Sequence, residues 1–322
     1  MQLLNKKFSP LASESVPRYA GIATFMRLPY YDIEEAQGAQ IGLYGLPWDG
    51  GTTNRPGARH GPRQIRDASS MMRKRHPVLN LSPFELANCA DLGDAPVNPL
   101  MIEETLDKIE RFVDGMVTRD IIPLGAGGDH LVSLPVLRSL AKKHGPMGMV
   151  HFDAHTDTWD RYFGDCKYTH GTPFRRAIEE GLLDPKRIVQ IGIRGGLYSE
   201  TDDDWGLAQG IRVMRMEEFT ELGIAKTIEI ARAVVGEQPC YVSFDVDCLD
   251  PAFAPGTGTP EIGGLTTVEA QQTLRGLLGL NMVGADVVEV SPPFDPSGTT
   301  ALVGATLMWE ILCLLSDKVA RG

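Results

Sequence analysis

Short apolar runs alternate with longer amphipathic stretches along the whole sequence, and this alternation restricts the fold more than any other feature. The runs are rich in Val and Ile, are almost continuously apolar, and start at Ile41, Ile121, Met147, Arg187, Tyr241 and Met282. Runs of this kind are typical of parallel strands that helices cover on both faces.

The stretches between the runs have helical periodicity. In residues 103–117, one stripe of a helix would carry Leu106, Ile109, Phe112 and Val113. The same pattern recurs in residues 133–145, 227–235, 267–278 and 301–319. Strand–helix alternation predicts an α/β fold, here a single three-layer sandwich with a central parallel sheet. We predict that this domain spans residues 36–322 and that residues 1–35 form an N-terminal extension.

The charge and cysteine content of the chain indicate which binding partners and which cellular compartment to expect. The chain has 31 Lys and Arg against 42 Asp and Glu, a net charge of −11, which argues against nucleic acid and anionic membranes as partners. Five cysteines without a CxxC pair favour reduced thiols. The first residues lack the apolar core of a signal peptide, and Glu310 and Asp317 interrupt the late apolar stretch, which predicts a packed helix. We therefore expect a cytoplasmic protein.

Ionisable residues follow three of the apolar runs. His130 ends the motif G-G-D-H, the motif D-A-H-T-D spans residues 153–157, and the motif S-F-D-V-D spans residues 243–247. Alternate residues of an extended strand point to one face, so we expect the acidic and imidazole groups of each motif to converge. Ligands of open α/β sheets bind at the carboxyl ends of strands, and so many carboxylates would repel one another without cations. Two imidazoles and four carboxylates predict a pair of bridged first-row divalent ions.

Four other histidines, His60, His76, His144 and His151, lie outside these three motifs. A single histidine of this kind is more often a helix cap or a surface residue than a ligand. We therefore expect these four to be caps or surface residues.

The three motifs resemble the signatures of the ureohydrolases, the arginase and agmatinase family, in their order and spacing. The likeness runs from about Tyr19 to the C-terminus. Residues 51–66 (G-T-T-N-R-P-G-A-R-H-G-P-R-Q-I-R) and 255–264 (P-G-T-G-T-P-E-I-G-G) are most similar to the branch of agmatinase, guanidinobutyrase and guanidinopropionase. This resemblance implies an arginase-like fold and hydrolysis of a guanidino compound.

The resemblance also implies which residues hold the metals. One ion would be surrounded by His130, Asp153, Asp157 and Asp245, and the other by Asp153, His155, Asp245 and Asp247. Asp153 and Asp245 would bridge the two ions. Mn²⁺ is the usual ion of the family and Ni²⁺ occurs in a few members, and nitrogen and oxygen donors do not distinguish them.

Further roles follow from the same resemblance. His170 matches the family's histidine that transfers a proton, and Glu289 matches the glutamate that binds the guanidinium. Asp157 counts with them as catalytic, and Thr259 matches a position that lines the substrate pocket. Trp159 departs from the asparagine found in arginases, and its indole would favour a cationic or apolar substrate tail.

The resulting hypothesis is a binuclear-metal hydrolase that converts agmatine, guanidinobutyrate or guanidinopropionate to urea and an amine. An N-alkylated guanidine or a biguanide such as metformin is the alternative substrate class. Two other hypotheses remain open, a deacetylase on the same general fold and a poorly active partner subunit of a mixed oligomer. By analogy with the family, we expect a homo-oligomer, either a hexamer or a trimer.

Overall fold

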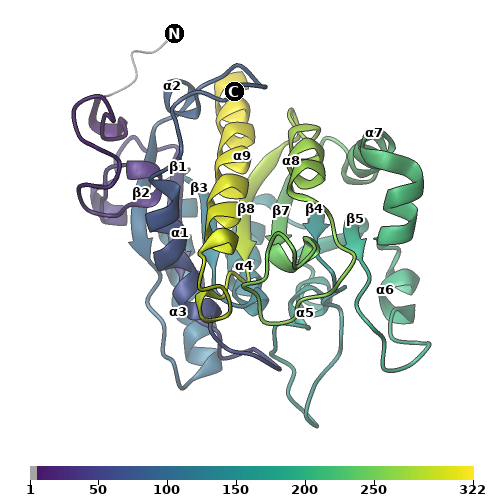
Figure 1. Cartoon of the computed structure of the whole chain (residues 1–322). Coiled ribbons are helices and arrows are strands. Elements are labelled where there is room, and N and C mark those ends of the chain that lie inside the picture. The colour runs from purple at the N-terminus through teal and green to yellow at the C-terminus, as the bar shows by residue number, and fades with distance from the viewer. Residues whose placement is uncertain (1–5) are drawn as a thin grey trace.

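The computed structural model describes residues 6–322, which form an eight-stranded sheet with helices on both faces (Figure 1). Every pair of neighbouring strands is parallel, in the order β2-β1-β3-β8-β7-β4-β5-β6. The strands are β1 (Ile41–Leu46), β2 (Cys89–Asp94), β3 (Ile122–Gly127), β4 (Met147–Phe152), β5 (Leu183–Ile193), β6 (Arg212–Arg215), β7 (Cys240–Asp245) and β8 (Met282–Val288).

The connections between the strands carry most of the helices. The α-helices are α1 (Gly61–Ser69), α2 (Pro83–Leu86), α3 (Ile102–Val117), α4 (Ser133–His144), α5 (Pro173–Glu179), α6 (Asp204–Gln209), α7 (Met216–Val235), α8 (Thr267–Arg275) and α9 (Thr299–Arg321). Short 3₁₀ helices are η1 (Lys6–Phe8), η2 (Phe25–Arg27), η3 (Ile33–Glu35), η4 (Ala58–His60), η5 (His130–Val132), η6 (Val246–Cys248) and η7 (Pro292–Phe294).

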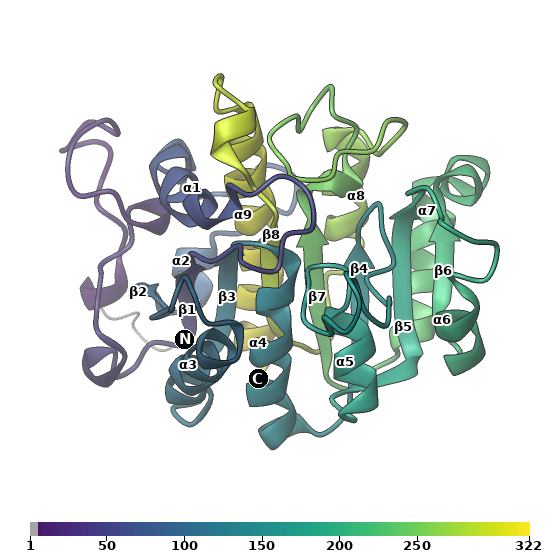
Figure 2. The same ribbon diagram turned by 90° about the horizontal axis from the view of Figure 1, so that it is seen from below.

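Two helical layers cover the sheet, as Figure 2 shows along its edge. One layer contains α1, α9, α8 and α7, and the other contains α3, α4 and α5. Each layer buries its own apolar cluster against the sheet, which is why the central strands are apolar on both faces. The predicted three-layer sandwich with a parallel sheet is confirmed.

Helix α9 is long and apolar enough to cross a membrane by length and composition, but 78% of its most apolar window is buried inside the fold. Glu310, which interrupts its apolar sequence, is buried and accepts hydrogen bonds from Arg275. The prediction that this stretch is a packed helix is confirmed.

All six predicted strands are present, and β2 and β6 were not predicted. β2 has the sequence C-A-D-L-G-D, whose Asp91 is buried beside Arg66, and β6 is only four residues long with Arg at both ends. Both strands lie at sheet edges, where apolar runs are shorter because fewer neighbours cover them. The division between residues 35 and 36 stays a prediction, although Phe25 is fully buried in the core.

The sheet order brings the polar motifs together. β3, β8, β7 and β4 are direct neighbours at the centre of the sheet, and each runs into one of the polar segments at its carboxyl end. Residues that are up to about half the chain apart in sequence therefore meet at one edge.

Candidate active site

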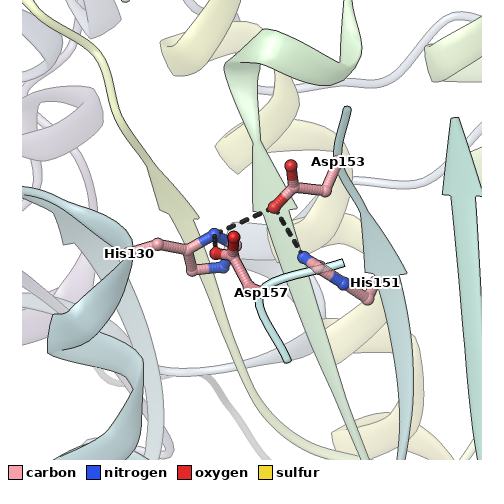
Figure 3. A group of neighbouring side chains, drawn as sticks. All are labelled: His130, His151, Asp153 and Asp157. Carbon is pink, nitrogen blue, oxygen red and sulfur yellow. Dashed lines mark hydrogen bonds and ion pairs between the residues drawn. The ribbon is translucent and has the colours of Figure 1, made fainter. Parts of the chain in front are cut away.

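His130 lies at the centre of a buried group of carboxylates (Figure 3). Its Nδ1 atom is 3.0 Å from Oδ2 of Asp153, 3.0 Å from Oδ2 of Asp157 and 3.3 Å from Oδ2 of Asp245. This nitrogen has no hydrogen-bond partner in the structure. A ring nitrogen surrounded by carboxylate oxygens but bonded to none of them is the arrangement that a shared cation satisfies.

The loop that carries His130 requires glycine at its start. A Cβ atom on Gly128 would lie 1.7 Å from the carbonyl oxygen of Trp48, so the chain can only turn here without a side chain. Asp129 then accepts hydrogen bonds from the backbone N–H groups of Gly51 and Leu131. These contacts fix the backbone from which the His130 ring projects.

The second histidine of the cluster is His155. Its Nδ1 atom is 3.1 Å from Oδ2 of Asp247 and 3.4 Å from Oδ1 of Asp153, and its Nε2 atom is 3.6 Å from Oε1 of Glu261. Its side chain is 27% exposed, whereas that of His130 is 1% exposed. The structure thus brings together all six predicted ligands, in an inner group around His130 and an outer group around His155, and their role as ligands stays a prediction.

The expectation that strand alternation makes these side chains converge was wrong. β4 ends at Phe152 and β7 at Asp245, so strand alternation does not aim the motifs. Instead, Asp153 accepts from the N–H of His155 at 2.6 Å, and Asp245 accepts from the N–H of Asp247 at 2.8 Å. Each carboxylate closes a tight turn with one oxygen and leaves the other for the cluster.

Electrostatics show that the group needs positive charge. Burial and the charges of Asp247 and Asp153 raise the pKa of Asp245 well above its usual range. Burial and the charge of Asp153 also raise the pKa of Asp247. Buried carboxylates crowded in this way are stable in their charged form only when cations lie between them. Nitrogen and oxygen donors in this arrangement fit divalent metal ions, and the chain has a divalent-metal-binding site.

His151 is a residue that the sequence analysis misjudged. It is fully buried at the end of β4, where its Nε2 atom is 2.8 Å from Oδ2 of Asp153 (Figure 3). Gln190 bonds its other ring nitrogen, so His151 fixes the orientation of Asp153. The expectation of a cap or surface residue is wrong here because the strand buries both of its faces. It is also wrong for His76, which is buried against Trp309 and pairs with Glu310.

His170 and Glu289 form a buried pair beside the cluster. Nδ1 of His170 donates to Oε1 of Glu289 at 2.9 Å. Burial lowers the pKa of His170, but the hydrogen bond and charge of Glu289, with the charges of Asp129 and Asp157, outweigh it and raise the pKa to about 9. The other ring nitrogen is 2.7 Å from Oγ1 and 3.1 Å from the N–H of Thr53. The Thr53 hydroxyl can therefore accept from the protonated ring, and its backbone N–H can donate to the neutral ring. Thr53 was not among the predicted site residues.

Glu289 keeps one oxygen free. Its Oε1 atom accepts from the backbone N–H of His130 at 3.0 Å as well as from His170, whereas the buried Oε2 atom has no partner. Glu289 and Asp157 both have a left-handed backbone, with φ of 64° and 53°. Such a conformation costs a non-glycine residue about 1–3 kcal/mol and is concentrated at functional sites.

A cavity of about 460 Å³ opens over these residues. Glu289, His170 and the metal-site carboxylates line its inner end. Trp159 lines the outer end, packed between Tyr162 and Tyr198 at centroid distances of 5.5 Å and 5.2 Å. We call these three side chains the aromatic wall. Thr259 also lines the cavity, as expected, and its hydroxyl lies 3.4 Å from Asp247.

Among the described residues that line the cavity, Arg55 is the only lysine or arginine. Its Nε and Nη2 atoms donate to the carbonyl oxygens of Gly258 and Thr257, and its guanidinium stacks on Phe294 at 4.3 Å. Arg55 therefore ties the loop 51–60 to the loop that carries Thr259. Arg55 lies in the motif of residues 51–66, where the sequence alone did not indicate a role for it.

Comparisons with known proteins agree with this geometry. A family model described as the arginase family matches residues 39–314. The guanidinopropionase of Pseudomonas aeruginosa is 62% identical to this chain over 313 residues, which cover 97% of this chain and 98% of that protein. The guanidinobutyrase of the same organism is 47% identical, with the same coverage of 97% and 98%. The solved structure of proclavaminate amidino hydrolase from Streptomyces clavuligerus is 41% identical and covers 94% of this chain and 99% of that one, with a TM-score of 0.90.

Proposed function

The chain belongs to the arginase family, and from this membership and its site we propose that it is a metal-dependent hydrolase of short guanidino acids. The reaction would cleave the guanidino C–N bond and release urea and an amino acid. Similarity to the guanidinopropionase supports guanidinopropionate as the first substrate to test, followed by guanidinobutyrate.

The unpartnered Oε2 atom of Glu289 is the observation that carries this proposal. It is a buried carboxylate oxygen that lines the cavity beside the metal-site residues. Burying such an acceptor without a donor is costly, and a guanidinium supplies two N–H donors in one plane. Glu289 would therefore orient the guanidinium carbon toward the metal side of the cavity.

His170 can deliver the proton that the reaction needs. The departing amine must be protonated, since an amide anion is too basic to leave. Before metal binds, the pKa of His170 is raised to about 9, so the ring readily takes up a proton, and Thr53 and Glu289 hold it in place. Thr53 can also stabilise the ring after the proton has gone, through its backbone N–H.

We further propose that two divalent ions occupy the site, Mn²⁺ in the first instance and Ni²⁺ as the alternative. The inner ion would be held by His130, Asp153, Asp157 and Asp245, and the outer ion by Asp153, His155, Asp245 and Asp247. When bound, such ions lower the pKa of a water molecule and make it a nucleophile at neutral pH.

The aromatic wall favours a second candidate substrate class. Arg55 is the one lysine or arginine among the described residues that line the cavity, and two of its three guanidinium nitrogens already bind carbonyl oxygens. It is therefore only partly available to bind a substrate carboxylate. The faces of Trp159, Tyr162 and Tyr198 suit methyl groups or a cation. N-alkylated guanidines and biguanides such as metformin are therefore the second candidate.

A product screen tests both candidates. The purified chain, loaded with Mn²⁺ or with Ni²⁺, is given guanidinopropionate, guanidinobutyrate, agmatine and metformin in parallel. Urea is measured for the first three compounds, and urea, guanylurea and dimethylamine are measured for metformin. We expect product formation that disappears with a chelator and returns with metal. Guanidinopropionate as best substrate supports the first candidate, and metformin supports the second.

The control for the screen is Glu289→Gln, which keeps the shape of the side chain but removes its charge. We expect this variant to keep its metal and to lose activity toward every substrate. Absence of every hydrolysis product from all four compounds in a wild-type chain that holds two ions would overturn the proposed reaction.

We also propose that the protein works in a reducing compartment such as the cytoplasm. All five cysteines are free, and four of them are buried. Burial raises the pKa of the Cys248 thiol, the cysteine nearest to the metal motif in sequence, well above its usual value. A thiol of this kind is unreactive, which agrees with the absence of a catalytic cysteine from the proposed mechanism.

A further inference from the structure

Asp286 is a carboxylate that the mechanism above does not use. It lies in the middle of β8, is fully buried, and is surrounded by hydroxyl groups. Oδ2 accepts from the hydroxyls of Ser133 and Tyr241, both at 2.6 Å, and Oδ1 accepts from the hydroxyl of Ser243 at 2.6 Å. No ion pair within residues 6–322 includes Asp286. A buried charge compensated only by hydroxyls is costly, so its position calls for a reason.

Ser243 connects this carboxylate to the metal cluster. It is the direct partner of Asp286 in the β7–β8 register, and its Oγ atom is 2.8 Å from Nε2 of His130. A serine hydroxyl has one proton, and the carboxylate of Asp286 can only accept. Ser243 therefore donates to Asp286 and must accept the Nε2–H of His130.

This order of donors fixes the tautomer of His130. With the proton on Nε2, the Nδ1 atom carries the lone pair, and Nδ1 is the atom that lies within 3.0–3.3 Å of Asp153, Asp157 and Asp245. A lone pair aimed at carboxylates is repulsive unless a cation lies between them. The network thus keeps a proton on Nε2 and leaves Nδ1 as the ring nitrogen that can bind a metal.

We propose that Asp286 is a positioning residue that acts through Ser243 to hold His130 as an Nδ1 donor to the inner metal ion. This inference rests on the metal site of the proposed function. Asp286 touches neither substrate nor metal, and its effect passes through one hydroxyl. Ser133 and Tyr241 bond its other oxygen and keep the carboxylate in place.

Asp286→Asn is the test variant, because the amide has nearly the same size but can donate to Ser243. Ser243 would then donate to His130 and drive its proton to Nδ1, the atom that must bind metal. We expect one of the two ions to bind about 10- to 100-fold more weakly, with the other unchanged. Calorimetric titration with Mn²⁺ measures both affinities, and the EPR spectrum separates a coupled Mn²⁺ pair from a single ion. Unchanged affinities for both Mn²⁺ ions in Asp286→Asn would overturn the proposal.

Two further variants separate positioning from general packing. Tyr241→Phe removes a donor to Oδ2 of Asp286 but leaves the hydrogen bonds from Asp286 through Ser243 to His130 intact. We therefore expect nearly normal metal binding. Ser243→Ala should weaken the same ion as Asp286→Asn, and the double variant should be no worse than Ser243→Ala alone. Equal weakening by Tyr241→Phe would overturn the proposal. A wild-type chain that binds no divalent ion would instead contradict the proposed function itself.

Discussion

The inner and outer ends of the cavity are built in opposite ways. At the inner end, Asp153, Asp245 and Glu289 are buried, and backbone N–H groups bond one oxygen of each. At the outer end, Tyr198 is 84% exposed and Trp159 is held by ring contacts, with one backbone hydrogen bond to Gly171. We therefore expect the chemistry to depend on the buried inner end, and the choice of substrate tail to depend on side chains at the outer end.

The two histidines of the metal site differ in exposure in the same way as the two ends of the cavity. His130 is enclosed and reaches the buried Asp286 through Ser243. His155 is partly exposed, and the carboxylate next to its Nε2 atom belongs to Glu261, a residue at the rim of the cavity. Changes at the inner end should affect every substrate, and changes at the outer end should alter the order of preference.

The largest effect is expected from Asp245→Asn at the inner end. This carboxylate would bridge both ions, and losing its charge removes several kcal/mol of cation binding, so turnover should fall by more than about 10³-fold for all substrates. Metal content after gel filtration and urea release measure the two losses. Asp165→Asn, an exposed carboxylate, is the control and should behave as wild type. Two ions and full activity in Asp245→Asn would remove this residue from the site.

His170→Asn should be the next most damaging change. Loss of a general acid costs about 10²- to 10⁴-fold, and the loss should appear in kcat because the residue acts on the leaving amine. Two ions should remain bound, since His170 is not among the predicted ligands. Steady-state kinetics with two different substrates check the prediction. If kcat falls equally for both substrates, His170 acts at the inner end of the cavity. If kcat falls for only one substrate, His170 acts in recognition of the substrate tail.

The pair of His170 and Glu289 also predicts a pH dependence of stability in the metal-free chain. The pKa of His170 is raised to about 9 in the folded state, above its ordinary value near 6.5. A raised pKa means that the folded state holds the proton more tightly, so the stabilisation is complete below about pH 6.5 and is lost as the pH rises through about 9. The Tm difference between wild type and His170→Gln should therefore shrink by a few degrees across this window. A constant difference would show that folding does not raise the pKa of His170.

Much of this site could be predicted from the sequence, for a physical reason. Six ionisable residues next to apolar runs predict one shared polar site, and the structure brings them together, while their role as metal ligands stays a prediction. How they converge was not readable. Turns closed by Asp153 and Asp245 aim their motifs, and Asp157 has a positive φ of its own. Residue types alone do not specify such local backbone geometry.

The supporting network was harder to predict than the ligands. His151 and Asp286 each lie inside an otherwise apolar strand, and each has a partner on another strand or helix, Gln190 for His151 and Ser133 for Asp286. A polar residue in the middle of such a run is the signal that could have identified both. In the fold, β6 was not predicted, because a strand of four residues with a charged residue at each end is too short to show a periodic pattern.

A smaller effect is expected at the rim from Glu261→Gln. Burial is slight here, and the hydrogen bond with His155 lowers the pKa of Glu261, which shows that the two groups interact. Removing the charge should weaken the outer ion by about 10-fold, because partners of a metal-bound histidine tune its affinity. Titration with Mn²⁺ measures this, with the exposed Glu229→Gln as control. Weakening of the inner ion to the same degree would contradict the separation of the two ends.

The smallest change in rate, and the sharpest test of the outer end, is expected from Trp159→Asn. Its indole forms the middle of the aromatic wall, and it bonds nothing at the metal cluster. Ring contacts of this kind are worth about 0.5–1.5 kcal/mol, which corresponds to about 2- to 12-fold. An asparagine amide would instead offer donors to a carboxylate. We therefore expect kcat/KM to fall for an N-alkylated guanidine or biguanide and to rise for guanidinopropionate, with metal content unchanged. Trp159→Phe, which keeps an aromatic face, should preserve the wild-type order of substrates. If the ratio of the two kcat/KM values is the same in all three proteins, Trp159 does not contact the tail.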